Sequence, residues 1–390
     1  MDFFHTPCYL CFMDRIYLDT ASTSFPKAPG VAEAMANFIL SNGCNINRGG
    51  YAQAYEAEEL VFDTRERIAS LFDFPKPDHV VFTANVTTAL NFIIKGLFGR
   101  GDHVLVTSME HNAVMRPLVQ MERHGVSFSR IPCTSRGELE TETIESLIKT
   151  NTKAIIMTHA SNVCGTVMPV AEVARIAHRH GLYLVVDAAQ TAGILPIDMQ
   201  AMGIDILCFT GHKGLGGPQG TGGFLISEAL AQRIEPLISG GTGSMSDSEE
   251  VPVWLPDRFE AGTMNLPGIA GLHAALDSIR YDRHEDLSAL FLEGLRNIAG
   301  AKLVGRDGTD GRLAVFGVDF PDHDNAYIAA ALEERYAIMT RVGLHCAPNA
   351  HKTLGTFPKG LVRFSFGPAT TETEIETTLA ALRSILNAGK

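Results

Sequence analysis

The stretch Asp205-Ile-Leu-Cys-Phe-Thr-Gly-His-Lys213 carries most of the information about the fold of this chain. Its first half is almost wholly apolar, as in a strand that helices cover on both faces, and its last residue is a lysine followed by several glycines. Similar short runs occur on both sides of it, with helical patterns between them. The sequence therefore predicts an α/β fold with a mainly parallel seven-stranded sheet. The expected strands are His79–Thr83, His103–Thr107, Val126–Ile131, Lys153–Thr158, Leu182–Asp187, Asp205–Phe209 and Gly223–Ile226.

Polar side chains follow several of these strands, at the sheet edge where ligands of such folds bind. Thr87 and Thr88 open a helix, where hydroxyls and free N–H groups can hold a phosphate, although an ordinary helix cap is the simpler explanation of this pair alone. His111 could stack on a flat ring, and Asn162 could donate to a ring oxygen. Taken singly, both are more often ordinary polar or turn residues. Their common position nevertheless makes them candidate ligand-binding residues.

Asp187 and Lys213 form the strongest pair of candidates, because each ends a buried strand. A buried carboxylate is costly unless a cation is its partner, and a protonated pyridine nitrogen is such a cation. A lysine whose pKa is lowered by burial can form an imine with an aldehyde. The pair therefore predicts pyridoxal 5'-phosphate (PLP) as the cofactor. Gln190 could reach the phenolate oxygen of the ring, and Thr210 and His212 could contact the phosphate.

Cys346 lies in Arg341-Val-Gly-Leu-His-Cys-Ala-Pro348, a short polar turn between two apolar segments. A thiol on a loop, next to His345 and near positive charge, is typical of a sulfur nucleophile, because these neighbours favour the thiolate. The alternative is a structural cysteine. Together with the lysine motif, this loop predicts chemistry on the sulfur of an amino acid.

The composition fits a soluble, cytoplasmic enzyme of two domains and excludes several classes of partner. The chain has 390 residues, 45% of them hydrophobic, and a net charge of −12. This charge and the lack of any long basic run argue against nucleic acid as a partner. No apolar stretch approaches the roughly 20 residues that span a bilayer, and the N-terminus lacks a secretory pattern. We therefore expect neither a membrane span nor export.

The cysteines and histidines do not predict a metal site or a disulfide framework. Seven scattered cysteines fit a reducing compartment, and the Cys8-x-x-Cys11 pair lacks the strand and helix that would support a redox motif. His345, Cys346 and His351 have no fourth ligand at a zinc spacing. The glycine-rich segment after Lys213 contains no P-loop, and no dinucleotide fingerprint is present.

These motifs, in this order and over nearly the whole chain, resemble those of the fold-type I, class V PLP enzymes, and most closely the cysteine desulfurases and selenocysteine lyases. The resemblance extends from about Ile16 to the C-terminus. The matching motifs are Tyr17-Leu-Asp-Thr-Ala, Glu110-His111, Ser161-Asn-Val-Cys-Gly-Thr, Val186-Asp-Ala-Ala-Gln, Thr210-Gly-His-Lys, Arg258-Phe-Glu-Ala-Gly-Thr263, Arg341-Val-Gly-Leu-His-Cys and Val362-Arg-Phe-Ser.

The resemblance implies a role for each candidate residue. Lys213 would be the Schiff-base lysine, Cys346 the nucleophile that becomes a persulfide, and Arg363 the clamp on the substrate carboxylate. Arg341 would position the cysteine loop or assist in binding, although a structural salt bridge is nearly as good an explanation. Thr263 would reach the phosphate of a neighbouring subunit, which implies a homodimer with shared active sites. The cofactor contacts would be Thr87, Thr88, His111, Asn162, Asp187, Gln190, Thr210 and His212, with Asn162 also near the substrate.

The predicted function is PLP-dependent conversion of L-cysteine to L-alanine, with the sulfur passing to Cys346 and then to a possible acceptor protein. Two alternatives stay open: a selenocysteine lyase, or another aminotransferase, lyase or epimerase of this fold that does not need Cys346. A PLP-fold scaffold without activity is the third. The predicted domains are an N-terminal extension (1–15), a segment joining the small domain (16–30), a large PLP-binding domain (31–265) and a small domain carrying the cysteine loop (266–390).

Overall fold

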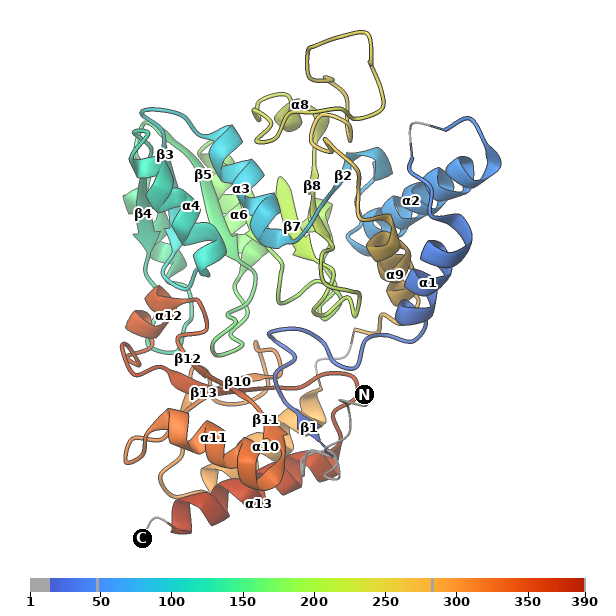
Figure 1. The fold of residues 1–390 in the computed structure, drawn as a ribbon. Helices are drawn as coiled ribbons and strands as arrows, with labels where there is room; N and C mark the ends of the chain where they lie inside the picture. Colours follow the sequence, from blue (N-terminus) through green and yellow to red (C-terminus); the bar gives the residue numbers. More distant parts are fainter. Residues whose placement is uncertain (1–14, 47–48, 282–283, 389–390) are drawn as a thin grey trace.

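The computed structural model describes residues 15–46, 49–281 and 284–388, and they form two domains that lie one above the other in Figure 1. The predicted N-terminal extension, including Cys8 and Cys11, lies outside the described residues except for Arg15. No helix in this part of the chain is long and apolar enough to cross a membrane.

The large domain is built on a seven-stranded sheet, as the sequence predicted. Its strand order is β2-β8-β7-β6-β5-β3-β4, with parallel pairing throughout except around β8, which is antiparallel to both of its neighbours. The strand positions were predicted to within one residue at each end. The observed bounds are β2 Val80–Thr83, β3 His103–Thr107, β4 Ser127–Ile131, β5 Thr152–Thr158, β6 Tyr183–Asp187, β7 Ile206–Thr210 and β8 Gly222–Ile226.

Helices cover both faces of this sheet, and for that reason its central strands are apolar on both sides. Val104 and Leu105, adjacent in β3, belong to the cores on opposite faces. One core is closed by α3 (Val86–Leu97) and α4 (Asn112–Glu122). The other is closed by α2 (Ala52–Leu71), α6 (Val170–Arg179) and α9 (Leu266–Leu276).

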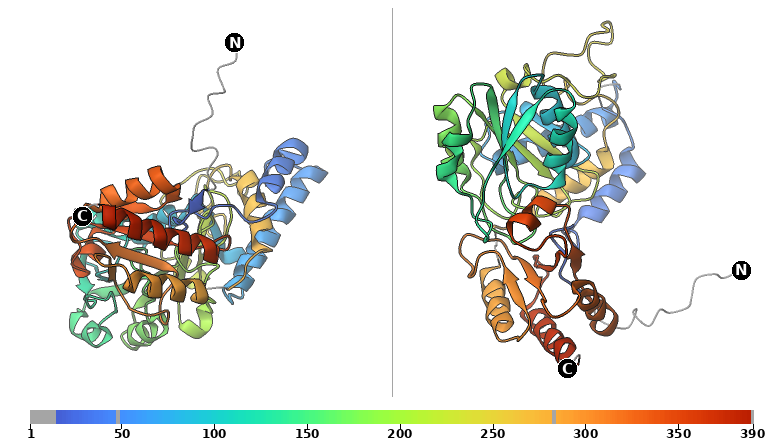
Figure 2. Two further views of the ribbon diagram at one scale, coloured as in Figure 1. Left: turned by 90° about the horizontal axis from the view of Figure 1, so that it is seen from below. Right: turned by 90° about the vertical axis from the view of Figure 1, so that its left-hand side faces the viewer.

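The small domain is an antiparallel sheet with helices on one side (Figure 2). Four phenylalanine rings, Phe291, Phe316, Phe364 and Phe366, form the centre of its core, with centroids 5.0–5.4 Å apart. The strand order is β12 (Arg341–Gly343), β13 (Leu361–Ser365), β10 (Val315–Asp319) and β9 (Lys302–Val304), and the helices are α10 (Glu285–Arg296), α11 (Asn325–Tyr336) and α13 (Glu372–Ala388).

Helix α9 packs in the large domain, although the sequence suggested that it belongs to the small one. The small domain was expected to begin at Leu266, but α9 begins there and packs against α1 (Val31–Asn37), α2 and the core of the large sheet. We therefore place the boundary after α9. The remaining helices are η2 (Phe38–Asn42), η3 (Pro77–His79), η4 (Thr141–Thr143), α5 (Ile144–Leu147), α7 (Met199–Met202), α8 (Glu228–Ala231) and α12 (Pro348–Thr353).

The segment that follows Arg15 contacts both domains. Strand β1 (Ile16–Tyr17) pairs in parallel with β11 (Ile338–Met339), and Leu18 is buried in the small-domain core. Further on, the N–H of Ser24 donates to the carbonyl of His212 at 2.9 Å. This short stretch thus connects the small domain to the loop that carries the predicted Schiff-base lysine.

Candidate active site

The candidate site lies where the loops after β3, β5, β6 and β7 meet the small domain. The N–H of Asn112 donates to the carbonyl of Cys346 at 2.8 Å, and Asn162 Nδ2 donates to the carbonyl of His345 at 2.8 Å. Arg363 Nη1 in turn donates to the carbonyl of Asn162 at 3.0 Å. Residues that are far apart in the sequence therefore share one polar cluster.

Lys213 and Asp187 interact electrostatically within this cluster. Loss of solvation lowers the pKa of Lys213 to about 8, although the negative charge of Asp187 opposes the shift. Burial raises the pKa of Asp187, while the N–H of Ala189, which donates to Oδ1 at 2.9 Å, and Lys213 act in the other direction. About a tenth of the Lys213 amine is therefore uncharged at pH 7, far more than for an ordinary lysine, and can act as a nucleophile or base.

These groups fit PLP. Asp187 is a buried carboxylate whose ionised form needs a cation, and a protonated pyridine nitrogen supplies one. Lys213 lies in the loop after the neighbouring strand β7, and its pKa is lowered. Imine formation with the aldehyde requires such a lysine. The residues that would hold the cofactor are accordingly Asp187 and Lys213, with His111 beside them.

His111 is the N-terminal cap of α4 and is neutral. Its Nδ1 accepts a hydrogen bond from the N–H of Ala113 at 3.0 Å, so the ring proton is on Nε2. Burial lowers its pKa to about 4, and the positive charges of Lys213 and Arg341 add to this effect. A neutral aromatic ring held by its own helix is suited to stacking on a cofactor ring.

Two arginines of the small domain converge on Ser22. Arg363 Nη2 donates to Asp19 Oδ1 at 2.6 Å and to Ser22 Oγ at 2.7 Å, and Arg341 Nη1 donates to the same Ser22 oxygen at 3.0 Å. Arg363 Nε is buried and has no hydrogen-bond partner. Since one carboxylate faces two guanidinium groups, the cluster has a surplus positive charge that suits the carboxylate of a substrate.

Cys346 is exposed at the edge of this cluster. Its Sγ lies 3.6 Å from Arg341 Nη2, so a guanidinium group contacts the sulfur. His345 does not have the role expected of it: its side chain is buried, contacts His351 and the carbonyl of Arg341, and has its pKa lowered to about 2, mainly by burial. The prediction that His345 favours the thiolate is therefore wrong, and Arg341 supplies the positive charge.

The predicted phosphate contacts have other partners in this structure. Thr88 donates to Asn85 Oδ1 at 3.2 Å as part of the cap of α3, and Thr87 is exposed beside it. Thr210 donates to the carbonyl of Thr221 at 3.4 Å. The contacts of the other two predicted cofactor ligands are His212 Nδ1 with Thr23 Oγ1 at 3.0 Å, and Gln190 Nε2 with the carbonyl of Ala21 at 3.2 Å. Their roles toward a phosphate or a cofactor ring stay predictions.

Thr263 is separate from the other site residues. It is exposed, and its hydroxyl accepts a hydrogen bond from Asn45 Nδ2 at 3.4 Å. Its role toward the phosphate of a second subunit stays a prediction.

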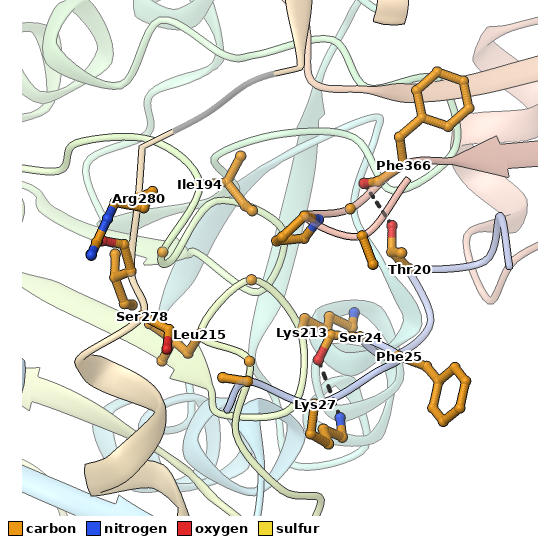
Figure 3. Close-up of a pocket in the computed structure, with 18 of the residues that line it drawn as sticks. Thr20, Ser24, Phe25, Lys27, Ile194, Lys213, Leu215, Ser278, Arg280 and Phe366 are labelled. Atoms are coloured by element: carbon orange, nitrogen blue, oxygen red, sulfur yellow. Dashed lines mark hydrogen bonds between the residues drawn. The ribbon is translucent and has the colours of Figure 1, made fainter. Parts of the chain in front are cut away.

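A cavity of about 500 Å³ lies beside Lys213, between the N-terminal segment and both domains (Figure 3). Its walls are mostly apolar, and Lys213 and Gln190 are the two predicted site residues that line it. At its edge Lys27 Nζ donates to Ser24 Oγ at 3.2 Å, and Thr20 Oγ1 donates to the carbonyl of Phe366 at 2.8 Å. The cavity leaves room for the Lys213 side chain to move.

Three residues of the cluster had no predicted role. Asp19 lies within the Tyr17-Leu-Asp-Thr-Ala motif and Ser22 directly follows it, but only the fold brings them to Arg363. Glu110, in the Glu110-His111 motif, is fully buried, and burial raises its pKa to about 8. A carboxylate directly before a strand-end histidine was the available signal for Glu110. Among the described residues, no group of three or more His, Cys, Asp and Glu could hold a metal ion.

Comparisons with known proteins agree with this geometry. The family model for the class-V aminotransferases matches residues 16–378. A probable cysteine desulfurase of Methanothermobacter thermautotrophicus is 33% identical, over 96% of both chains, and a cysteine desulfurase of Escherichia coli (strain K12 / DH10B) is 32% identical, over 85% of this chain and 84% of its own. The apo structure of a cysteine desulfurase from Thermococcus onnurineus NA1 superimposes with a TM-score of 0.89 at 30% identity, covering 96% and 95% of the two chains.

The chain belongs to the class-V aminotransferase family. Its mainly parallel sheet and the helices that cover it have the fold-type I arrangement that the sequence predicted.

Proposed function

We propose that this protein is a PLP-dependent cysteine desulfurase, which converts L-cysteine to L-alanine and takes the sulfur onto Cys346 as a persulfide. The observation that carries the proposal is the position of Cys346: an exposed thiol next to Arg341, on a loop bound to the residue after His111. An aminotransferase has no need of a thiol there. The relatives, which are named cysteine desulfurases, support the same activity.

The arginines and Lys213 would prepare the substrate. Arg363 would bind the substrate carboxylate, exchanging part of its present contact with Asp19 and Ser22 for the bidentate contact that a guanidinium group favours. Lys213 Nζ, with a pKa of about 8, would take the α-proton. PLP, when bound, supplies the sink for the electron pair that this proton leaves behind.

Cys346 would then carry out the sulfur transfer. The thiolate attacks the sulfur of the substrate, a new S–S bond forms, and the carbon–sulfur bond of the substrate breaks. The bonding electrons remain on the β-carbon, which takes up a proton, and Lys213 returns its proton to the α-carbon to give alanine. The positive charge of Arg341 beside Sγ stabilises the attacking thiolate.

The test measures alanine release from L-cysteine by the wild type and by Cys346→Ala, with PLP and a reductant present. We expect release by the wild type and a loss of at least about a hundredfold in the variant, because the nucleophile is gone. Equal release would make the thiol incidental. L-Selenocysteine should be assayed in parallel, since selenolate leaves more readily than thiolate, and activity that survives only on this substrate would indicate a selenocysteine lyase.

The proposal includes a cytoplasmic homodimer with shared active sites. It also includes an acceptor protein that takes the sulfur from Cys346. Thr263 supports the dimer, because in its own chain it contacts Asn45 and does not line the cavity beside Lys213. From the neighbouring subunit it would reach the phosphate. The exposed position of Cys346 supports an acceptor, because a persulfide there is open to attack by another thiol.

A further inference from the structure

Two buried histidines behind the Cys346 loop have no part in the proposed chemistry. His345 and His351 are 3% and 0% exposed, and their rings are 19° from parallel with centroids 5.5 Å apart. His345 Nδ1 lies 3.3 Å from His351 Nε2, and His345 Nε2 lies 3.2 Å from the carbonyl oxygen of Arg341. His351 Nδ1 lies 2.7 Å from Thr356 Oγ1. A continuous chain of hydrogen bonds thus connects Thr356 to the main chain of Arg341.

The direction of every bond in this chain follows from its last member. The carbonyl of Arg341 can only accept, so His345 carries its proton on Nε2. In the neutral ring Nδ1 is then an acceptor, and the donor to it is the Nε2–H of His351. His351 Nδ1 must accept in turn, so the hydroxyl of Thr356 donates. Each bond has one proton and no donor faces another donor.

The arrangement requires both rings to be neutral, and their surroundings ensure this. Burial is the main cause that lowers the pKa of His345 to about 2 and of His351 to about 4. The positive charges of Arg363 and Arg341 act on His345 in the same direction. The two histidines therefore stay uncharged near neutral pH, and they serve as fixed hydrogen-bonding groups.

The loop needs such support because its backbone is strained. His345 and Cys346 have φ of 49° and 56°, a left-handed conformation that side chains with a β-carbon disfavour. Two bonds hold the carbonyls of this pair, from Asn162 Nδ2 and from the N–H of Asn112. The histidine chain fixes the remaining side of the loop, and it also fixes the main chain of Arg341, whose guanidinium group contacts Sγ.

We propose that His351 and Thr356 are positioning residues for the Cys346 nucleophile. Through His345 they hold the loop in the conformation that keeps the sulfur in contact with the Arg341 guanidinium group. The inference rests on the proposed function in one respect, namely that Cys346 accepts the sulfur. His351 acts through another residue, so it should affect the transfer step rather than substrate binding.

The experiment compares His351→Leu with His351→Gln, whose amide N–H can still donate to His345 Nδ1. Thr356→Val and Thr356→Ser form a second, milder pair, in which only serine keeps the donor. The full-length PLP-loaded proteins are assayed for kcat and KM of alanine release, and for the rate at which iodoacetamide labels the Cys346 peptide, followed by mass spectrometry.

We expect His351→Leu to lower kcat by about fivefold or more, because the loss of one buried hydrogen bond corresponds to a rate factor of about this size. KM should change by less than about twofold. The labelling rate of Cys346 should change in the same variant, and His351→Gln and Thr356→Ser should stay near the wild type. Equal losses in the leucine and glutamine variants, or wild-type behaviour of the leucine variant, would overturn the proposal.

The labelling measurement separates this inference from the proposed function. If the wild type released no alanine, the desulfurase assignment would fail, but the contrast in labelling between His351→Leu and His351→Gln would still report on the position of the thiol. Cys44, which is half-buried and belongs to another part of the large domain, serves as the internal control for labelling.

Discussion

At the scale of single residues, the charge of Arg363 is central to the candidate site. It is buried and donates to Asp19, to Ser22 and to the carbonyl of Asn162. We expect Arg363→Lys to raise KM for L-cysteine by about tenfold or more, because an ammonium group cannot make the paired contact to a carboxylate. Steady-state kinetics check this, and the PLP absorbance of the variant shows whether the site is otherwise intact. A KM within about twofold of the wild type would assign the substrate carboxylate to another group.

The raised pKa of Glu110 should make the free energy of unfolding depend on pH. Its Oε1 accepts from the N–H of Thr158 at 2.9 Å and from the Thr107 hydroxyl, while Oε2 is buried without a partner. Burial raises its pKa from 4.5 to about 8, so the folded protein keeps this proton between these two values while the unfolded chain loses it. The folded state binds more protons in that window, and its stability therefore falls as the pH rises through it, by up to about 1.4 kcal/mol per pH unit.

Glu110→Gln tests this linkage, because glutamine resembles the protonated acid and cannot ionise. The melting temperature of the variant relative to that of the wild type should increase as the pH is raised from 5 to 8, the window given by the shift of Glu110. Thermal unfolding at several pH values measures the difference, in which the contributions of the buried histidines cancel. A difference that is independent of pH would mean that Glu110 is ionised in the folded protein.

The local sequence predicted that candidate polar residues accompany the ends of buried strands: Asp187 ends β6, and Lys213 and His111 lie in the loops that follow β7 and β3. It could not predict the partners that the fold brings from far away. Asp19 and Arg363 are 344 positions apart and belong to segments that meet only in the small domain. The error about His345 has the same origin, because adjacency to Cys346 in sequence says nothing about a backbone whose left-handed turn directs the two side chains apart.

At the scale of elements, the central strands of the large sheet were predictable because they are apolar on both faces and separated by clear helical patterns. The short strands β1, β9, β11 and β12 have two or three residues each and carry no such pattern. Helix α9 was assigned to the wrong side of the boundary because seven of its eleven residues are buried. A helix that is apolar nearly all round does not reveal which core it joins.

Arg312 connects the loop of Asn162 to the small domain, and its loss should therefore destabilise the contact between these elements. Its side chain is 2% exposed and donates to the carbonyls of Arg306, Cys164 and Val315 at 2.7, 3.2 and 2.8 Å. Arg312→Met should cost about 3 kcal/mol or more of unfolding free energy, because several buried carbonyls lose their donors. The contact between β10 and the loop that carries Asn162 should weaken as well, because Arg312 bonds to both.

Arg306→Met is the matched control for that measurement. Arg306 forms an ion pair with Glu138 at 3.1 Å, and about a third of each side chain is exposed. Its loss should cost no more than about 1 kcal/mol. Urea unfolding of both variants gives the comparison, and equal costs would show that the carbonyls around Arg312 find other donors.

At the scale of the whole molecule, the proposed site includes Thr263 of a second subunit. Thr263 is exposed and bonded to Asn45, and apolar side chains are exposed on the segments next to these two residues. Ile39 and Leu40 in η2 are 63% and 83% exposed, and Val253 and Trp254 are 55% and 47% exposed. Two adjacent pairs of strongly exposed apolar side chains suit an interface that would cover them. The proposed homodimer would bury them and bring Thr263 to the second active site.

Size-exclusion chromatography with light scattering should therefore give about 84 kDa, twice the 42.2 kDa of one chain. Leu40→Glu places a charge in the expected interface, so it should shift the protein toward the monomer and lower its PLP content, because each site loses the partner's contribution. Tyr327→Glu is the control, since Tyr327 is 48% exposed on α11 of the small domain. A Leu40→Glu protein that stays dimeric would move the interface elsewhere, and a monomeric one with full PLP content would show that Thr263 has no role in holding the phosphate.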